Sequence, residues 1–362
     1  MSVQITSNPV PLVIMLPPFA FVVVVGIVHR VPAHSQINCA TALISSAKPA
    51  TEGVEFKEVV RMASYSVDKV EVFGRGVLKS EGVVIDKDNN VYGGGRNGVM
   101  YKVTPDGKVS ELCTLPAGSI PNGVTMDRQG NLVYCDLGKQ AMMRVTQGGK
   151  VSMIADRVGN LALTLPNFAT YDANGNLYAS NSSTRDIKTA LVEMAKPEPN
   201  GALVRIRPDG KGEIVASGIY LANGTAIDPK EEAVYLLEST RNDCLRIAIK
   251  KDGTFGKPEI YSKDFPALPD GMAFATDGTL FVTLPAFIRG GKMAPAHQII
   301  QVDTNGKWTT LIDDADGQKL NFPTNCAFGG PGLQDLYIAN LEGDHFSRIH
   351  TTFHGHPLYH QR

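Results

Sequence analysis

The stretch Pro269-Asp270-Gly271-Met272-Ala273-Phe274, followed by Asp277-Gly278-Thr279-Leu280-Phe281-Val282, is one copy of a phrase that occurs six times in the chain. Each copy opens on a side chain that carries an oxygen, continues as an apolar run, and returns after a short turn as a second apolar run. The opening residues are Glu81, Asn122, Asn167, Asn223, Asp270 and Asn325. Their spacings of 41, 45, 56, 47 and 55 residues match the length of a four-stranded sheet with its loops.

Short antiparallel strands are predicted within each unit, because apolar residues alternate over four to seven positions between Gly, Asn, Asp and Pro. In the first unit the strands are expected at 82–86, 91–94, 99–103 and 108–112. The turn Pro105-Asp106-Gly107 combines a proline of fixed φ with a permissive glycine, as a tight turn requires. Four strands in each of six units predict an all-β fold, a six-bladed β-propeller.

The ring is expected to close with a strand from the other end of the chain. The last unit offers three strands, and the alternating segment 67–73 would complete that blade and remove two open sheet edges. The predicted domains are therefore a linker or arm at 36–66, the propeller at 67–352 and a polar C-terminal tail at 353–362. The long segments 181–201 and 284–298 are predicted to be loops at the mouth of the ring, where specificity is usually built.

The first 35 residues differ from the rest of the chain. The run from Leu12 to Val28 is apolar and uncharged, and Ala33-His34-Ser35 has the small-x-small form of a signal-peptidase site. These features predict a signal peptide and a secreted or periplasmic protein. No basic residue precedes the run and Arg30 follows it, so a membrane anchor or an apolar extension of a cytoplasmic protein are the alternatives. Membrane contact is expected only if this segment is retained.

The charge pattern disfavours nucleic acid as a partner. The chain has 35 Lys and Arg against 36 Asp and Glu, with no basic run of the kind that holds phosphate backbones. The five cysteines show no C-x-x-C spacing, so no zinc or thioredoxin-like motif is predicted.

The six opening residues should converge on the propeller axis at one mouth of the tunnel. A single Asn or Asp at the start of a strand is usually a turn residue, but turns do not explain a whole column. Glu81 and Asp270 would repel each other there unless a cation lay between them. Carboxylate and amide oxygens are the ligands that calcium takes, and the column holds no Cys or His to favour zinc. A second column is predicted to make only turns, namely Asp86, Asp127, Asp172, Asp228 and Asp277.

Four motifs in the column resemble those of a known family. They are Ser80-Glu81-Gly82, Leu165-Pro166-Asn167, Ala222-Asn223-Gly224 and Leu268-Pro269-Asp270-Gly271-Met272-Ala273. They look like the senescence marker protein, gluconolactonase and luciferin-regenerating enzyme family, six-bladed calcium propellers related to diisopropyl fluorophosphatase and paraoxonase. The resemblance covers about residues 67–350.

The resemblance implies that one divalent cation is held by Glu81, Asn167, Asn223 and Asp270. Ca²⁺ is the expected ion, with Mg²⁺, Mn²⁺ or Zn²⁺ as alternatives. The implied reaction is hydrolysis of a lactone or ester, with the cation as Lewis acid and Asp270 as general base or nucleophile. Asn167 belongs to the catalytic set as well as to the ligands, and Asn122 is predicted to contact substrate, as is Asn325.

The sequence departs from the sugar-lactone members of that family at two positions. Those members carry Arg two residues before the Asn that corresponds to Asn167, and Asp directly after it, whereas this chain has Leu165 and Phe168. We therefore expect a substrate less polar than gluconolactone, with Phe168 and His345 among its contacts. Other charged candidates on the mouth loops are Arg185, Arg289 and Lys292.

Two other classes of function remain open at this point. The phrase Gly123 to Leu132 would suit an NHL repeat, so a non-enzymatic binding propeller, similar to NHL or strictosidine-synthase-like scaffolds, is one alternative. A lyase or isomerase that uses the same metal and acid is another. A binding scaffold has no need for two carboxylates among amides on the axis, which favours an enzyme.

Overall fold

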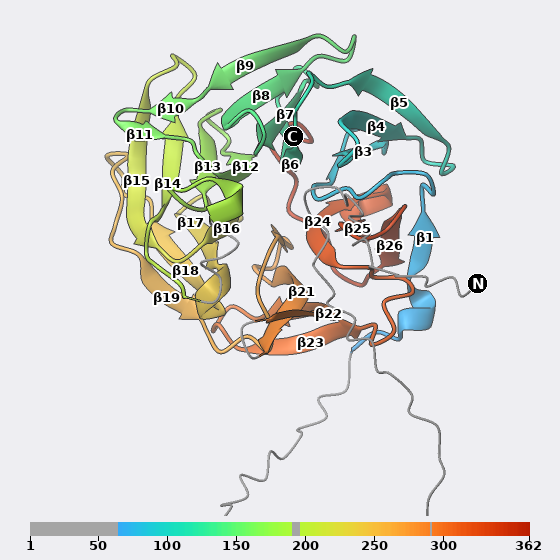
Figure 1. The fold of residues 1–362 in the computed structure, drawn as a ribbon. Coiled ribbons are helices and arrows are strands. Elements are labelled where there is room, and N and C mark those ends of the chain that lie inside the picture. Colours follow the sequence, from blue (N-terminus) through green and yellow to red (C-terminus); the bar gives the residue numbers. More distant parts are fainter. Residues whose placement is uncertain (1–63, 190–195, 290–291) are drawn as a thin grey trace, which may run out of the picture. The chain divides into compact units, whose positions relative to one another are not determined.

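The computed structural model describes residues 64–189, 196–289 and 292–362. Six four-stranded antiparallel sheets form a ring, so the predicted six-bladed propeller is confirmed (Figure 1). The predicted signal peptide at 1–35 and nearly all of the predicted arm at 36–66 lie outside the described residues. Within the described ranges, no helix is long and apolar enough to cross a membrane.

Each blade runs outward from the axis as a simple meander of four strands. The blades are numbered 1 to 6 along the chain, and their strands are given from inner to outer. Blade 1 is β2 (Val84–Ile85), β3 (Val91–Gly94), β4 (Val99–Val103) and β5 (Val109–Thr114); blade 2 is β6 (Pro121–Met126), β7 (Leu132–Asp136), β8 (Ala141–Val145) and β9 (Val151–Ala155); blade 3 is β12 (Pro166–Tyr171), β13 (Leu177–Asn181), β14 (Gly201–Ile206) and β15 (Gly212–Ile219). Blade 4 is β16 (Ala222–Ile227), β17 (Ala233–Glu238), β18 (Asp243–Ala248) and β19 (Glu259–Ser262); blade 5 is β20 (Met272–Phe274), β21 (Leu280–Arg289), β22 (Lys292–Val302) and β23 (Trp308–Asp313); blade 6 is β24 (Pro323–Gly329), β25 (Asp335–Asn340), β26 (Phe346–His350) and β1 (Glu71–Phe73). A small extra hairpin, β10 (Arg157–Val158) with β11 (Leu161–Ala162), lies between blades 2 and 3 in the chain.

Apolar side chains fill the spaces between neighbouring blades. Alternate residues of one strand face opposite neighbours, so Leu132 and Tyr134 pack with blade 1 while Val133 and Cys135 pack with blade 3. Among the described residues, such a cluster lies between every pair of adjacent blades. Burial on both faces explains why these strands appear in the sequence as short, nearly continuous apolar runs.

The predicted closure of the ring is confirmed. β1 pairs with β26, with Glu71 opposite Arg348 and Phe73 opposite Phe346. The strand is shorter than the predicted segment, because residues Val67–Lys69 form a 3₁₀ turn (η1) in which the side chain of Ser66 accepts a hydrogen bond from the amide of Asp68. One blade therefore combines both ends of the propeller sequence, and the short outer strand β1 covers the edge of β26.

The aspartates of the second column form turns, as predicted. Oδ1 of Asp86 accepts hydrogen bonds from the backbone amides of Asp88 (2.9 Å) and Asn90 (2.8 Å). The same kind of bond to a backbone amide in the turn is made by Asp127, Asp172, Asp228 and Asp277. These carboxylates satisfy amides that the turn would otherwise leave unpaired.

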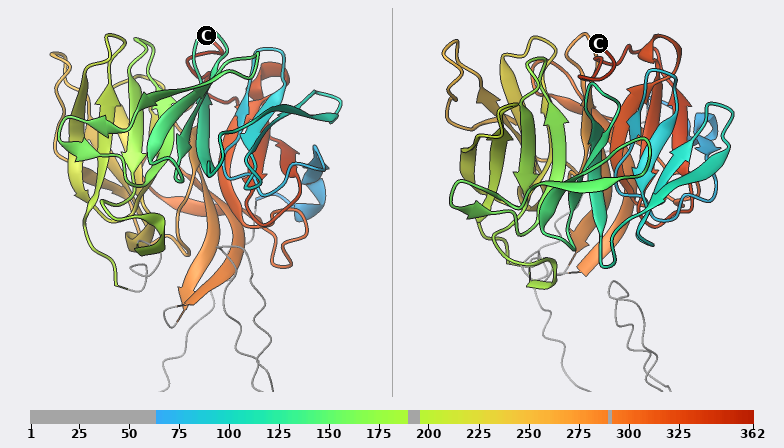
Figure 2. Two further views of the ribbon diagram at one scale, coloured as in Figure 1. Left: turned by 45° about the horizontal axis from the view of Figure 1, so that its top comes forward. Right: turned by 90° about the horizontal axis from the view of Figure 1, so that it is seen from above.

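The prediction of a loop at 284–298 is wrong. β21 and β22 stay paired through almost all of it, and they form a long hairpin that projects from one end of the ring (orange, Figure 2). The hairpin accommodates Pro285 because this residue lies in a register shift between Leu284 and Ala286, where a proline costs no ladder hydrogen bond. The other long segment, 181–201, includes residues outside the described part of the chain.

The C-terminal residues pack across the end of the ring opposite the hairpin tip (Figure 2). The ring of Tyr359 stacks on Tyr171 of blade 3, with centroids 5.1 Å apart. The Nε2 atom of His360 lies 2.7 Å from the carbonyl oxygen of Ile85 in blade 1. The segment that composition sets apart as a polar tail thus links blades that are distant in sequence.

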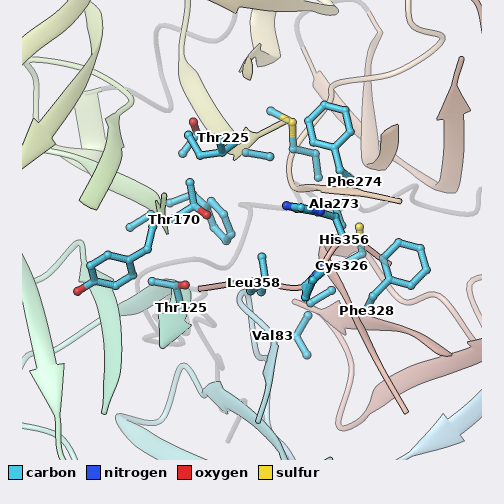
Figure 3. A pocket seen from close by; sticks show the side chains of 18 of the residues that line it. Val83, Thr125, Thr170, Thr225, Ala273, Phe274, Cys326, Phe328, His356 and Leu358 are labelled. Carbon is cyan, nitrogen blue, oxygen red and sulfur yellow. The ribbon is translucent and has the colours of Figure 1, made fainter. Parts of the chain in front are cut away.

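A small central cavity of about 50 Å³ lies between this C-terminal segment and the inner strands (Figure 3). Its lining includes Thr125, Thr170, Phe274, His356 and Leu358. Burial, together with the charge of Arg362, lowers the pKa of His356 to about 4, so this ring is neutral at physiological pH. The tail therefore presents a neutral imidazole together with the guanidinium of Arg362 to the central cavity.

Candidate metal centre and active site

The six predicted axial residues lie where the inner strands begin. Asn122, Asn167, Asn223 and Asn325 are within β6, β12, β16 and β24, whereas Glu81 lies three residues before β2 and Asp270 two residues before β20. In four blades the register of the inner pair shifts at this place, for example between Pro121 and Val124. A shift of this kind takes a side chain out of the regular alternation of the strand, and such bulges are common beside active sites.

Glycines after the column residues allow the inner strands to approach closely. The amide of Gly224 donates to the carbonyl oxygen of Asp270 (2.7 Å), and a Cβ atom on Gly224 would lie 2.5 Å from that oxygen. Between blades 2 and 3, Nδ2 of Asn122 donates to the carbonyl oxygen of Asn167 (3.2 Å). These contacts bring the column residues of neighbouring blades together at one end of the axis.

The two carboxyl groups share one electrostatic environment. Burial raises the pKa of Glu81 well above its usual value, and the nearby charge of Asp270 raises it further. Burial raises the pKa of Asp270 to about 7, although a hydrogen bond from Asn223 and the charge of Arg96 oppose this shift. Glu81 is buried, whereas Asp270 is partly open to solvent, so Asp270 is the more accessible of the two carboxyl groups.

The site contains oxygens that fit a cation. Oε2 of Glu81 and Oδ1 of Asn167 are buried without a hydrogen-bond partner among the described residues. An unpaired buried polar atom costs about 1–3 kcal/mol, and a hard cation would satisfy both oxygens. The described residues hold no group of three or more His, Cys, Asp or Glu that could bind a metal, so a cation at this place would need amide oxygens among its ligands.

Ser239 fixes the amide of Asn223. Nδ2 of Asn223 donates to Oγ of Ser239 (3.0 Å), and that hydroxyl donates to the carbonyl oxygen of Pro269 (2.7 Å). Ser239 opens the 3₁₀ turn η2 (Ser239–Arg241) directly after β17. It therefore ties the predicted ligand of blade 4 to the residue before Asp270 in blade 5.

Two predicted substrate contacts, Asn325 in the column and Phe168 directly after Asn167, already make contacts within the protein. Oδ1 of Asn325 accepts a hydrogen bond from the next amide, that of Cys326 (2.9 Å). Phe168 is buried, its ring lies against Gly123, and it lines the central cavity rather than a mouth loop. Their roles toward a substrate remain predictions.

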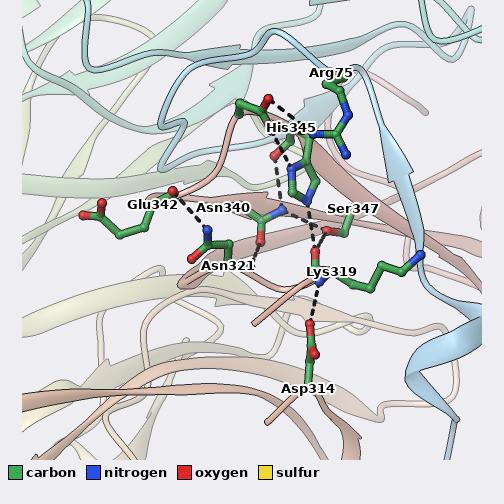
Figure 4. Close-up of polar contacts among 9 residues, drawn as sticks. Arg75, Asp314, Lys319, Asn321, Asn340, Glu342, His345 and Ser347 are labelled. Atoms are coloured by element: carbon green, nitrogen blue, oxygen red, sulfur yellow. Dashed lines mark hydrogen bonds and ion pairs between the residues drawn. The ribbon is translucent and has the colours of Figure 1, made fainter. Parts of the chain in front are cut away.

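His345 belongs to a polar cluster of blade 6 (Figure 4). Its Nδ1 atom lies 3.1 Å from the carboxylate of Asp344, and its Nε2 atom lies 3.1 Å from the carbonyl oxygen of Lys319. Asn340 donates to the carbonyl oxygen of His345 (3.1 Å) in the same cluster. Both ring nitrogens are thus engaged in holding loops together, and a contact with substrate stays a prediction. The side chains of Arg289 and Lys292 lie outside the described part.

Arg96 is a residue of the site that the sequence analysis missed. Its Nη1 donates to the carbonyl oxygen of Pro121 (3.1 Å) and its Nη2 to Oδ1 of Asn122 (3.0 Å). The pairing of the strands could have indicated this residue. Gly95 pairs with Ser80, the residue directly before Glu81, and Arg96 follows Gly95. The predicted charged candidates were instead placed on the longer loops.

The pKa of Asp270 predicts that cation binding depends on pH. The pKa of Asp270 is about 4 in the unfolded chain and about 7 in the cation-free fold. Between these two pH values the folded protein keeps a proton that the unfolded chain has lost, so the free energy of unfolding falls as pH rises through this range. A cation must displace the proton, so its affinity rises with pH. We expect about a tenfold gain in Ca²⁺ affinity per pH unit from 5 to 7. Calorimetric titration in buffers of different ionisation enthalpy would measure the released proton, and a flat profile would contradict it.

These features define a class of protein, a six-bladed propeller with two carboxyl groups among amides at one end of its axis. The chain belongs to the family described as the SMP-30/Gluconolactonase/LRE-like region, whose model matches residues 79–342. The family resemblance stated from the sequence motifs is confirmed.

Individual relatives are distant in sequence. The chain is 26% identical to a gluconolactonase of Zymomonas mobilis over 295 residues, 75% of this chain and 78% of the relative. It is 23% identical to strictosidine synthase-like 7 of Arabidopsis thaliana over 223 residues, 60% of this chain and 59% of the relative. Among solved structures, regucalcin of Agrobacterium tumefaciens, a calcium-binding protein, superposes with a TM-score of 0.61 at 15% identity, over 82% of this chain and 99% of the other. The last likeness concerns the fold alone.

Proposed function

We propose that this protein is a divalent-cation-dependent lactone hydrolase whose substrates are less polar than gluconolactone. The observation that carries the proposal is the pair of carboxyl groups, Glu81 and Asp270, beside the unpartnered buried oxygen of Asn167. The likeness to the gluconolactonase of Zymomonas mobilis supports lactone chemistry over other reactions of such a site.

The chain's own residues would divide the reaction between them. Glu81, Asn167, Asn223 and Asp270 would hold the cation, which supplies Lewis acidity toward the carbonyl oxygen of the substrate. Asp270 is positioned to take the proton of the attacking water and to return it to the ring oxygen that leaves.

The expected preference for a less polar substrate is supported by an apolar cluster ahead of two column residues. Leu137 and Leu165 are buried against each other, with Ile120 and Ile187 packed beside them. Ile120 and Leu165 each stand two residues before a column Asn, in blades 2 and 3. A lactone with an alkyl chain could cover this wall, whereas a polyhydroxylated ring would leave its hydroxyl groups unpaired there.

Hydrolysis of a lactone panel, followed by proton release, tests the proposal. We expect γ-lactones with alkyl chains of four or more carbons to be cleaved with kcat/KM about tenfold or more above that of glucono-δ-lactone, because each buried methylene adds selectivity. Treatment with a chelator should remove the activity and Ca²⁺ should restore it. Leu165→Arg is the matched variant, and it should reduce the alkyl preference without removing activity on small lactones.

Other outcomes point to other functions. A preference for gluconolactone in the wild type would contradict the less polar substrate. Cation binding without hydrolysis of any lactone or ester would favour a lyase or isomerase on the same site. Absence of both binding and hydrolysis would favour a scaffold, as the likeness to strictosidine synthase-like 7 leaves open.

A further inference from the structure

A ring of hydrogen bonds links the blades at the height of the candidate metal site. In most blades a small polar side chain donates to a backbone carbonyl at the start of the next inner strand. The neutral links are Asn122 to Asn167, Ser182 to Ala222, Ser239 to Pro269, Thr283 to Thr324, and Thr324 to Glu81. These links need no charge, because a hydroxyl or an amide suffices for one hydrogen bond.

The link from blade 1 to blade 2 is different, because Arg96 makes it. Gly95 pairs with Ser80, Asn181 with Pro166 and Glu238 with Ala222, and the second residue of each pair directly precedes a column residue. Arg96, Ser182 and Ser239 each follow the first residue of such a pair, so they occupy equivalent positions. Its two bonds, to Pro121 and Asn122, come from different nitrogens and so fix the plane of the guanidinium. Blade 1 thus places a permanent positive charge where two other blades have a hydroxyl.

This charge acts on the residues that would hold the cation. The guanidinium of Arg96 is close enough to Glu81 and to Asp270 to oppose the rise in the pKa of both carboxyl groups. It also donates a hydrogen bond to Oδ1 of Asn122, which makes that oxygen a weaker ligand for a cation. With both carboxylates ionised, the site has a net charge of −1 rather than −2 before any cation enters.

We infer that Arg96 is a built-in counter-charge that limits how tightly the axial site binds a divalent cation and disfavours more highly charged ions. The inference rests on the proposed metal-dependent function. Repulsion between Arg96 and a bound ion scales with the charge of that ion, whereas a loss of structural support would not. Arginine keeps its proton at any physiological pH, so the effect is not a switch.

Calorimetric titration of the chelator-treated full-length protein with Ca²⁺ and with Tb³⁺ tests this inference. Arg96→Gln, which keeps hydrogen-bonding capacity without charge, should bind Ca²⁺ about tenfold tighter than wild type and Tb³⁺ about thirtyfold tighter. Arg96→Lys, which keeps the charge, should bind both ions within about threefold of wild type. Arg96→Met is a second uncharged variant. The test needs only one uncharged variant that is folded, as shown by a cooperative thermal unfolding transition.

Ser182→Ala is the matched control, because it removes the equivalent link in blade 3 without changing the charge. We expect it to leave the ratio of Tb³⁺ to Ca²⁺ affinity unchanged. The inference is overturned if a folded uncharged variant binds Ca²⁺ no more tightly than wild type, or if its gain is equal for both ions. If the wild type binds neither ion, the metal site of the proposed function fails, and the counter-charge role fails with it.

Discussion

Asp270→Asn is expected to lose Ca²⁺ binding and to lower kcat/KM for lactone hydrolysis by about a thousandfold or more. The substitution removes one of two anionic ligands and the group that accepts the proton, and general bases alone contribute a hundredfold to ten-thousandfold. The cation-free variant should nevertheless be at least as stable as wild type at pH 8. Burial raises the pKa of Asp270, so its ionised form destabilises the fold at that pH, and a neutral amide does not carry this cost.

The measurements are Ca²⁺ titration, steady-state hydrolysis and thermal unfolding with and without chelator. Asp277→Asn is a matched control, since it makes the same chemical change at an exposed turn of the same blade. It should stay within about twofold of wild type in affinity and rate. Full metal content together with a full hydrolytic rate in Asp270→Asn would contradict the role assigned to this residue.

Truncation of the chain after Gly355 is expected to lower the unfolding temperature by roughly 10 °C, a loss of several kcal/mol. The deletion removes the stacking of Tyr359 on Tyr171, the bond of His360 to Ile85 and the packing of Leu358. It also exposes the apolar lining of the central cavity at that end of the ring. Differential scanning fluorimetry of the cation-free protein would measure the effect.

The truncated protein should bind Ca²⁺ at 20 °C within about threefold of the full chain. The column begins the inner strands, whereas the C-terminal segment contacts their far ends, so the two features are separated along the tunnel. Tyr359→Ala is a smaller step that removes only the stacking and its buried area, and it should cost about 1–2 kcal/mol. An unchanged unfolding temperature in the truncated protein would show that the segment does not stabilise the ring.

The repeated phrase was sufficient to predict the number of blades, the order of their strands and the column at the start of each inner strand. These are local properties, since alternation, turn residues and spacing are all encoded within about fifty consecutive residues. Closure by the segment at 67–73 was also predictable, because a missing strand at one end and an extra strand at the other leave few alternatives. The aspartates of the turns were identified for the same local reason.

Only the tertiary structure decided which distant side chains meet. The partners of His345 include Lys319, and those of Arg96 include Asn122, in both cases across more than twenty residues. A hydrophobic pattern sets which face of a strand is buried, but it does not specify which loop a long polar side chain will reach. The register of the strands and the packing of neighbouring blades decide which loop is reached. They place the guanidinium of Arg96 near the carboxyl groups of Glu81 and Asp270, for which the sequence had indicated no counter-charge.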